Sequence, residues 1–263
     1  MLRVAEGIGR GVVRGVEEVG FAGALFAEAM LWTALGPARR QPVRLPAVFL
    51  QMMQIGVQAL PIATVLAATI GMMLAIQSLY SLSLFGAEHF ATVGIALSVV
   101  REFAPLIVGI LIAGRSGSAL AARFSTMVIN QEVDALRVIG ISPVRFLVAP
   151  ALIAMMIMVP CLTMWANLVA LTAAGLFVTA ELGLSMTAYF ADVVAALSVN
   201  DLAHGLTKSA LFAALVAIVS SVNGALADGG AEGVGHRTTR AVVQSIAAII
   251  VADMIFAFVV TSG

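Results

Sequence analysis

The sequence predicts an all-α integral membrane protein: five transmembrane helices, an N-terminal amphipathic interfacial helix, and a short cytoplasmic helix between two spans. The first observation is composition, because 61% of the 263 residues are hydrophobic and 11% are charged, whereas soluble domains carry about 25% charged residues. The second is a set of apolar stretches that reach the roughly 20 residues needed to cross a bilayer. The third is that basic and non-basic connections alternate along the chain, as the positive-inside rule produces.

The first thirty residues are predicted to form a helix that lies flat on the cytoplasmic membrane surface. At 100° per residue the charged side chains fall within an arc of about 80° and apolar side chains lie opposite. The charged set is Arg3, Glu6, Arg10, Arg14, Glu17 and Glu28, and the apolar set is Ile8, Val12, Val19, Phe26 and Met30. This pattern is typical of interfacial helices. We therefore assign residues 1–58 to an N-terminal interfacial or elbow region and residues 59–263 to a transmembrane domain.

Five apolar segments are long enough to span a hydrocarbon core of about 30 Å. We expect the spans near residues 60–82, 91–114, 147–175, 205–227 and 241–261. Pro160, within the third span, is expected to bend that helix rather than divide it. Basic residues precede the first span and fill the second and fourth connections, and the other connections lack them. The N-terminus is therefore predicted to be cytoplasmic and the C-terminus to lie outside.

Four ionisable residues lie within the predicted spans, namely Arg101, Glu102, Lys208 and Asp253. Such a group costs about 2.5 to 3.5 kcal/mol at the bilayer centre, so it persists where it is paired or lines a wet cavity. Adjacent helical residues point about 100° apart, so Arg101 and Glu102 are poorly placed to pair with each other. We expect Arg101 to pair with Asp253 instead. The long stem of Lys208 could reach the outer interface. Two interpretations stay open: an internal ion pair that fixes helix register, or a polar patch in a substrate path where Arg101 or Lys208 meets an anionic headgroup.

The connection between the second and third spans contains a candidate docking helix near residues 127–142. Val133, Leu136, Arg137 and Gly140 recur at helical spacing, and Gly140 is a suitable residue to end a helix. A short helix of mixed charge between two spans suits the docking of a soluble partner. The alternative is a solvated loop helix that contacts nothing.

The sequence lacks the motifs of an enzyme. No G-x-x-x-x-G-K-[ST], H-E-x-x-H, C-x-x-C or G-x-S-x-G motif occurs. His89, His204 and His236 are scattered over both predicted sides of the membrane and cannot share a metal. The net charge of zero gives no indication of nucleic-acid binding. We therefore expect no catalytic residue, no metal and no cofactor, and any ATP would be hydrolysed by another chain.

Four stretches carry a pattern more specific than periodicity. They are Arg101-Glu102-Phe103-Ala104-Pro105, Ala113-Gly114-Arg115-Ser116-Gly117-Ser118-Ala119-Leu120-Ala121-Ala122, Asp134-Ala135-Leu136 with Gly140-Ile141-Ser142-Pro143, and Arg237-Thr238-Thr239-Arg240-Ala241-Val242-Val243. Together they resemble the MlaE/YrbE family of ABC transporter permeases, and the likeness covers almost the whole chain.

The resemblance implies an inner-membrane permease that works as a homodimer, with two ATPase subunits beneath it and MCE-domain proteins on the periplasmic side. It implies that phospholipids or related lipids are moved between the inner and outer membranes. It also implies that one helix couples the permease to the ATPase. The residues of that coupling helix would be Glu132, Asp134, Leu136, Arg137 and Gly140.

The main alternative is a secondary transporter or channel that runs on an ion gradient through Arg101, Glu102 and Asp253. The small number of ionisable groups in the spans argues against it. Five spans also cannot divide into equal inverted repeats, although a dimer could supply the symmetry. A non-transporting membrane scaffold is a third hypothesis.

Overall fold

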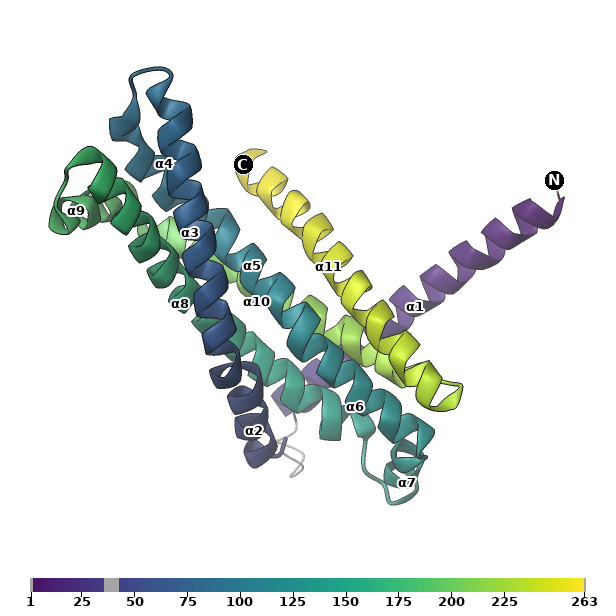
Figure 1. Cartoon of the computed structure of the whole chain (residues 1–263). Helices are drawn as coiled ribbons and strands as arrows, with labels where there is room; N and C mark the ends of the chain where they lie inside the picture. The colour runs from purple at the N-terminus through teal and green to yellow at the C-terminus, as the bar shows by residue number, and fades with distance from the viewer. Residues whose placement is uncertain (1, 36–42, 263) are drawn as a thin grey trace. The chain divides into compact units, whose positions relative to one another are not determined.

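The computed structural model describes residues 2–35 and 43–262, and the side chains of residues 13, 15–33 and 43–259 (Figure 1). The described residues form helices joined by short turns, with no strand among them. The α-helices are α1 (Leu2–Leu35), α2 (Leu45–Ile55), α3 (Leu60–Ser83), α4 (Ala91–Ser98), α5 (Ala104–Ile112), α6 (Ser118–Ile129), α7 (Glu132–Val138), α8 (Ala149–Leu182), α9 (Met186–Ala196), α10 (Val199–Ala225) and α11 (Gly230–Ser262). Short 3₁₀ turns are η1 (Val57–Ala59) and η2 (Glu88–Phe90), and π-helical turns are η3 (Val99–Phe103), η4 (Ala113–Gly117) and η5 (Val144–Val148).

Within the described residues, five helical stretches are long and apolar enough to cross a membrane, which confirms the predicted number. They are Leu45–Ser83, Glu88–Ile129, Val144–Leu182, Val199–Ala225 and Gly230–Val259. The fourth begins at Val199 rather than near residue 205. Pro160 lies inside α8 and does not divide it, as predicted.

The chain forms two compact units. The first comprises Met1–Gln51, Ala113–Ala154 and Ala214–Ser245, and the second comprises Met52–Ile112, Met155–Ala213 and Ile246–Gly263. Each unit is assembled from segments that are distant in sequence, because the long helices α8, α10 and α11 each contribute residues to both.

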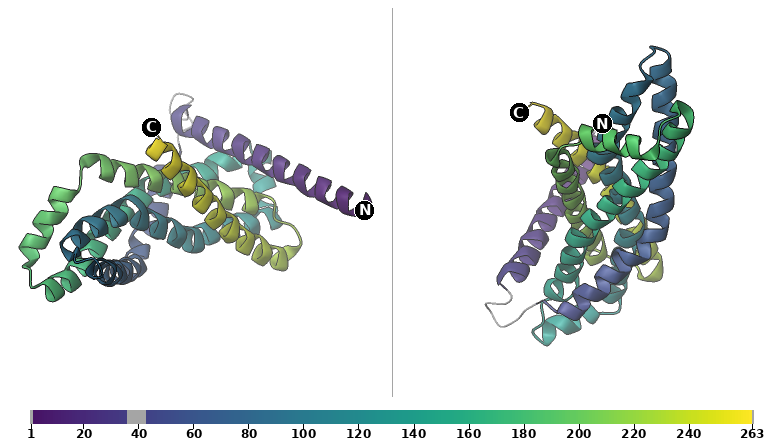
Figure 2. Two further views of the ribbon diagram at one scale, coloured as in Figure 1. Left: turned by 90° about the horizontal axis from the view of Figure 1, so that it is seen from above. Right: turned by 90° about the vertical axis from the view of Figure 1, so that its left-hand side faces the viewer.

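In the second unit, α3 and α4 form a hairpin and α9 packs beside α4 (Figure 2). One stripe of α3 is small and buried, with Ala63, Ala67 and Gly71 at four-residue intervals. A Cβ atom on Gly71 would lie 2.1 Å from the carbonyl oxygen of Ala170 in α8, so only glycine permits this approach. Close packing through small residues is the usual basis of helix association in membranes.

Tyr189 fixes α9 to the long helix α8. Its buried side chain donates a hydrogen bond of 3.1 Å from Oη to the carbonyl oxygen of Leu171. Burial raises the pKa of the Tyr189 hydroxyl to about 12, so the group keeps its proton and remains a donor at physiological pH.

In the first unit, α1 is a single uninterrupted helix (Figure 2). Leu25 and Ala29 are buried, whereas Val19, Phe26 and Met30 of the predicted apolar face are exposed. The helix at Arg3, Glu6, Ile8, Arg10, Val12 and Arg14 is described, but these six side chains lie outside the described set. Placement of α1 at a membrane surface stays a prediction.

The candidate docking helix is shorter than predicted. Residues 127–142 do not form one helix: α6 ends at Ile129, Gln131 adopts the left-handed conformation with φ 61°, and α7 covers only Glu132–Val138. The predicted end at Gly140 is confirmed, because Gly140 has φ 79°, a conformation that terminates helices.

Candidate functional site

The helix that carries Arg101 and Glu102 changes from α to π geometry over η3. Pro105 explains the change, because it has no N–H to bond the carbonyl of Arg101 and its ring would clash with that carbonyl in an α-helix. The N–H of Ala104 instead bonds the carbonyl oxygen of Val99, five residues earlier. Such π-helical turns occur frequently at functional sites.

Gly205 brings α10 directly against this π-helical turn. A Cβ atom at Gly205 would lie 2.2 Å from the carbonyl oxygen of Val100, so no larger residue fits without a shift of backbone. Asp201 and Lys208 lie on the same face of α10, because seven residues make about two helical turns. The close approach therefore places both side chains beside η3.

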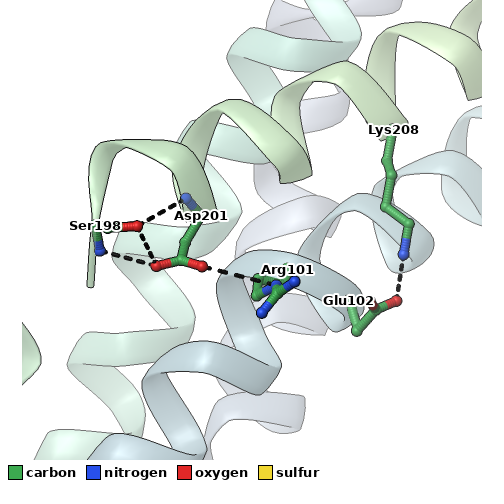
Figure 3. Close-up of polar contacts among 5 residues, drawn as sticks. All are labelled: Arg101, Glu102, Ser198, Asp201 and Lys208. Carbon is green, nitrogen blue, oxygen red and sulfur yellow. Dashed lines mark hydrogen bonds and ion pairs between the residues drawn. The ribbon is translucent and has the colours of Figure 1, made fainter. Parts of the chain in front are cut away.

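Arg101 pairs with Asp201, as Figure 3 shows. Its Nε lies 3.7 Å from Asp201 Oδ1. Ser198, which precedes α10, donates to Asp201 Oδ2 from its backbone nitrogen at 2.8 Å and from its hydroxyl at 2.7 Å. The backbone N–H of Asp201 returns a bond of 3.3 Å to Ser198 Oγ. This reciprocal capping holds the carboxylate in place for Arg101.

Lys208 lies at the centre of the remaining charges and is fully buried. Its Nζ contacts Glu102 of η3 (Figure 3) and lies 2.7 Å from Asp253 Oδ1 of α11. The ring of Phe256, one helical turn after Asp253, lies 5.7 Å from the ammonium, within range of a cation–π contact. The single lysine of the chain therefore ties three helical segments together.

His204 of α10 also contacts the ring of Phe256. The imidazole and the Phe256 ring meet edge to face, with centroids 4.8 Å apart and an interplanar angle of 84°. This is a favourable aromatic geometry. Phe256 therefore contacts both His204 and Lys208 of α10 and fixes α11 against them.

The accessible part of the cluster differs from its interior. The Arg101 and Glu102 side chains are 39% and 42% exposed, whereas Lys208 is inaccessible and already faces two carboxylates. Three acidic and two basic side chains leave a formal charge of −1 if His204 is neutral. A polar ligand would thus meet the guanidinium of Arg101 and the carboxylate of Glu102.

The structure corrects two details of the predicted pairing. Asp253 pairs with Lys208 and not with Arg101, whose partner is Asp201. The side chain of Lys208 does not extend to an outer interface, because it is fully buried between its two carboxylates. Asp201 was not considered as a partner because it was expected to lie outside the fourth span, whereas α10 begins at Val199 and includes it.

Sequence reasoning also missed residues of this cluster. A fourth span that starts near residue 205 places Ser198, Asp201 and His204 in the preceding connection, outside the span. Two signals were present. Ser198 and Asp201 stand three residues apart, as in a capping box, and Asp201 precedes Lys208 by seven residues on one helical face.

The predicted coupling residues belong to the first unit, and the charge cluster belongs to the second. Asp134 and Arg137 pair at 3.1 Å and are 69% and 66% exposed. Glu132 is exposed and accepts a bond of 3.3 Å from Asn130 Nδ2. Val133 turns inward and is buried. The polar face of α7 is thus open to solvent, as a docking surface must be.

Metal binding finds no basis in the part of the chain that the structure describes. No group of three His, Cys, Asp or Glu side chains gathers there as metal ligands would. The acidic residues of the cluster face Arg101 and Lys208 instead.

Comparison with known proteins gives one consistent result. The family described as Permease MlaE matches residues 48–259. A probable ABC transporter permease protein of Rickettsia typhi is 31% identical over 253 residues, 96% of each chain. A probable ABC transporter permease protein of Synechocystis is 34% identical over 216 residues, 81% of each. The chloroplastic protein TRIGALACTOSYLDIACYLGLYCEROL 1 of Arabidopsis thaliana is 33% identical over 205 residues, 78% of this chain and 59% of that protein.

Proposed function

Because the chain belongs to the MlaE family of ABC transporter permeases, we propose that it moves phospholipids or related lipids between the inner and outer membranes. As an ABC transporter permease it spans the membrane several times, and ATP is hydrolysed by separate partner subunits. The chain is therefore not itself the enzyme. Its match to the family over residues 48–259 is the observation that carries the proposal. A lipid as substrate is supported by the Arabidopsis relative, whose name contains that of a glycolipid.

In this proposal Arg101, Glu102, Lys208 and Asp253 form part of the substrate path. Arg101 is the cation that meets an anionic headgroup, because Lys208 is buried against two carboxylates. Glu102 is accessible beside it and would contact a cationic group of the same ligand. Lys208 and Asp253 hold η3, α10 and α11 in register rather than contact the lipid. This assignment combines both interpretations of the intramembrane charges.

Transport provides the first test. The chain is reconstituted with its ATPase partner in vesicles that contain a fluorescent phospholipid, and ATP-dependent lipid movement is followed. We expect movement with ATP, and a large loss in Arg101→Ala with ATP hydrolysis retained. If the wild-type complex hydrolyses ATP and moves no lipid of any headgroup, the lipid assignment is wrong.

The helix α7 is proposed as the coupling helix, on which the ATPase docks. Its exposed Glu132, Asp134 and Arg137 supply the contacts, Leu136 supports the helix, and Gly140 ends it. Replacement of the three charged residues by alanine should abolish co-purification with the ATPase while membrane insertion persists.

A control removes three carboxylates that lie outside α7, on the side predicted to be periplasmic. The residues are Glu88, Glu181 and Asp192. This control should leave ATPase binding unchanged. Wild-type co-purification by the α7 triple variant would refute the coupling assignment.

Further features complete the proposal. The working unit contains a second copy of the chain, the ATPase subunits and a periplasmic MCE-domain protein, and the chain itself needs no cofactor. Residues 59–263 form the permease domain and residues 1–58 its elbow region. The N-terminus is cytoplasmic and the C-terminus periplasmic, in the inner membrane.

An impermeant reagent should therefore label Gly263→Cys in intact spheroplasts of a Cys161→Ala background, and protection of that cysteine would overturn the topology.

Membership of an ABC permease family favours transport driven by ATP over an ion-gradient mechanism. Arg101, Glu102 and Asp253, which that alternative would use, all have partners of opposite charge. We therefore expect no ion-driven uptake in the absence of ATP, either in the wild-type chain or in a variant in which Asp253 is neutralised.

A further inference from the structure

The N-terminal helix α1 is attached to the chain that follows α7 by a specific polar contact. Glu28 Oε1 accepts a hydrogen bond of 2.8 Å from Ser142 Oγ and one of 3.1 Å from Trp32 Nε1. The guanidinium of Arg145 lies 5.3 Å from the centre of the Trp32 ring. A carboxylate that accepts two hydrogen bonds forms stronger contacts than neutral groups do. Glu28 thus joins α1 to the beginning of the third span.

Ser142 lies between the end of α7 at Val138 and the start of the third span at Val144. Its hydroxyl oxygen also accepts a bond of 3.3 Å from the backbone N–H of Arg145, the second residue of η5. Positive φ angles at Gln131 and Gly140 bound α7 on its two sides. Gln131 is strained in that conformation, whereas Gly140 adopts it without steric cost, and we take these two turns as the points about which α7 rotates. Ser142 is the next polar contact beyond the second turn.

A groove separates α7 from α1. Its volume is about 670 Å³, and its apolar lining includes Phe21, Leu25, Phe124, Val133 and Ile141. Because the groove is not filled by these side chains, α7 has room to move relative to α1. The Glu28–Ser142 contact lies at the edge of the groove, since both residues also line it.

A second contact holds α1 at another point. Arg240 of α11 donates from Nη2 to both carboxylate oxygens of Glu18, each at 2.8 Å. Glu18 and Glu28 are ten residues apart, or about 15 Å along a helix. The helix α1 therefore contacts the start of the third span through Glu28 and the N-terminal part of α11 through Glu18.

We propose that Glu28 is a positioning residue that passes the movement of α7 to α1 through Ser142, so that α1 acts as a lever in the transport cycle. This inference rests on the proposed function, in which the ATPase docks on α7. A pull on α7 rotates the chain at Gly140 and displaces Ser142. Glu28 follows, and α1 carries the displacement to Arg240 of α11.

The test uses the complete complex of permease and ATPase in lipid nanodiscs. A spin label is placed on the exposed position Val19→Cys of α1 in a Cys161→Ala background, and its mobility is compared without nucleotide and with ATP plus vanadate. We expect a nucleotide-dependent change that Ser142→Ala and Glu28→Ala abolish. Glu28→Gln should retain it, because the amide oxygen can still accept both hydrogen bonds. Glu17→Ala, which removes an exposed glutamate of the same helix, should also retain it.

Transport in vesicles supplies the second readout. With an allosteric coupling of typical size, Ser142→Ala should lower the lipid moved per ATP by about fivefold or more, while the ATPase still binds and hydrolyses ATP. Ser142→Ala removes the contact without altering α1, so it tests the inference even if Glu28→Ala fails to fold.

The outcomes separate this inference from the proposed function. A spin-label response of wild-type size in Ser142→Ala, with normal lipid moved per ATP, overturns the lever alone. Failure of the wild-type chain to bind any ATPase overturns the proposed function and the lever with it.

Discussion

Replacement of Lys208 by methionine tests whether one buried ammonium holds the charge cluster together. Lys208 Nζ lies 2.7 Å from Asp253 Oδ1 and also contacts Glu102. At that separation two unit charges attract by about 6 kcal/mol if the effective dielectric constant is about 20. Desolvation of both ions offsets much of this attraction. Removal of one partner still costs about 3–5 kcal/mol, because it leaves a buried charge unpaired.

The exposure of each carboxylate decides which one destabilises the fold when Lys208 is removed. The Glu102 side chain is 42% exposed and the Asp253 side chain 19%, so water screens Glu102 and the penalty falls mainly on Asp253. We therefore expect the loss of stability in Lys208→Met to lie at the low end of this range, about 3 kcal/mol. Asp253→Asn leaves Lys208 paired with Glu102 and should cost only about 1 kcal/mol.

The assay is thermal unfolding of the purified permease in nanodiscs. A loss of about 3 kcal/mol should lower the unfolding midpoint by roughly 6–12 °C for a chain of this size. The double variant Lys208→Met, Asp253→Asn removes both charges and should be more stable than Lys208→Met alone. If the losses of the two single variants simply add, the pair does not interact and the reasoning is refuted.

Two further substitutions test the packing of the second unit. Gly205→Ala places a Cβ atom 2.2 Å from the Val100 carbonyl oxygen, and overpacking of this kind should cost about 1–3 kcal/mol; Gly94→Ala, which meets no atom within 4 Å, is the control and should not destabilise. Tyr189→Phe removes the hydrogen bond to Leu171 and should cost about 1 kcal/mol at neutral pH. The pKa of Tyr189 is raised to about 12, from an ordinary value of about 10. Its neutral form thus stabilises the fold below pH 10, and wild-type stability should fall between pH 10 and 12. Tyr189→Phe should lack this decrease, and an equal decrease in the variant would contradict the assignment.

Rules that depend on local sequence predicted the number of long apolar helices correctly. Five spans follow from the lengths of the apolar stretches, and family membership follows from local motifs such as Arg101-Glu102-Phe103-Ala104-Pro105. The start of α10 was missed because Ser198 and Asp201 look like loop residues in a hydropathy reading. In the structure the same two residues cap the helix, which makes their polarity a helix signal.

The partners of the intramembrane charges depend on a local departure from helical geometry. A helical wheel assumes 100° per residue, and that assumption fails just before Pro105, where η3 accommodates an extra residue in the turn. Gly205 then admits the widened turn against α10. Pro105 and Gly205 can each be recognised in the sequence, but neither alone predicts the pairing. Pro105 changes the direction of the Glu102 side chain, and Glu102 then reaches Lys208 only because α10 approaches η3 closely. The charges could therefore be identified from sequence, while their pairing required the geometry of two helices together.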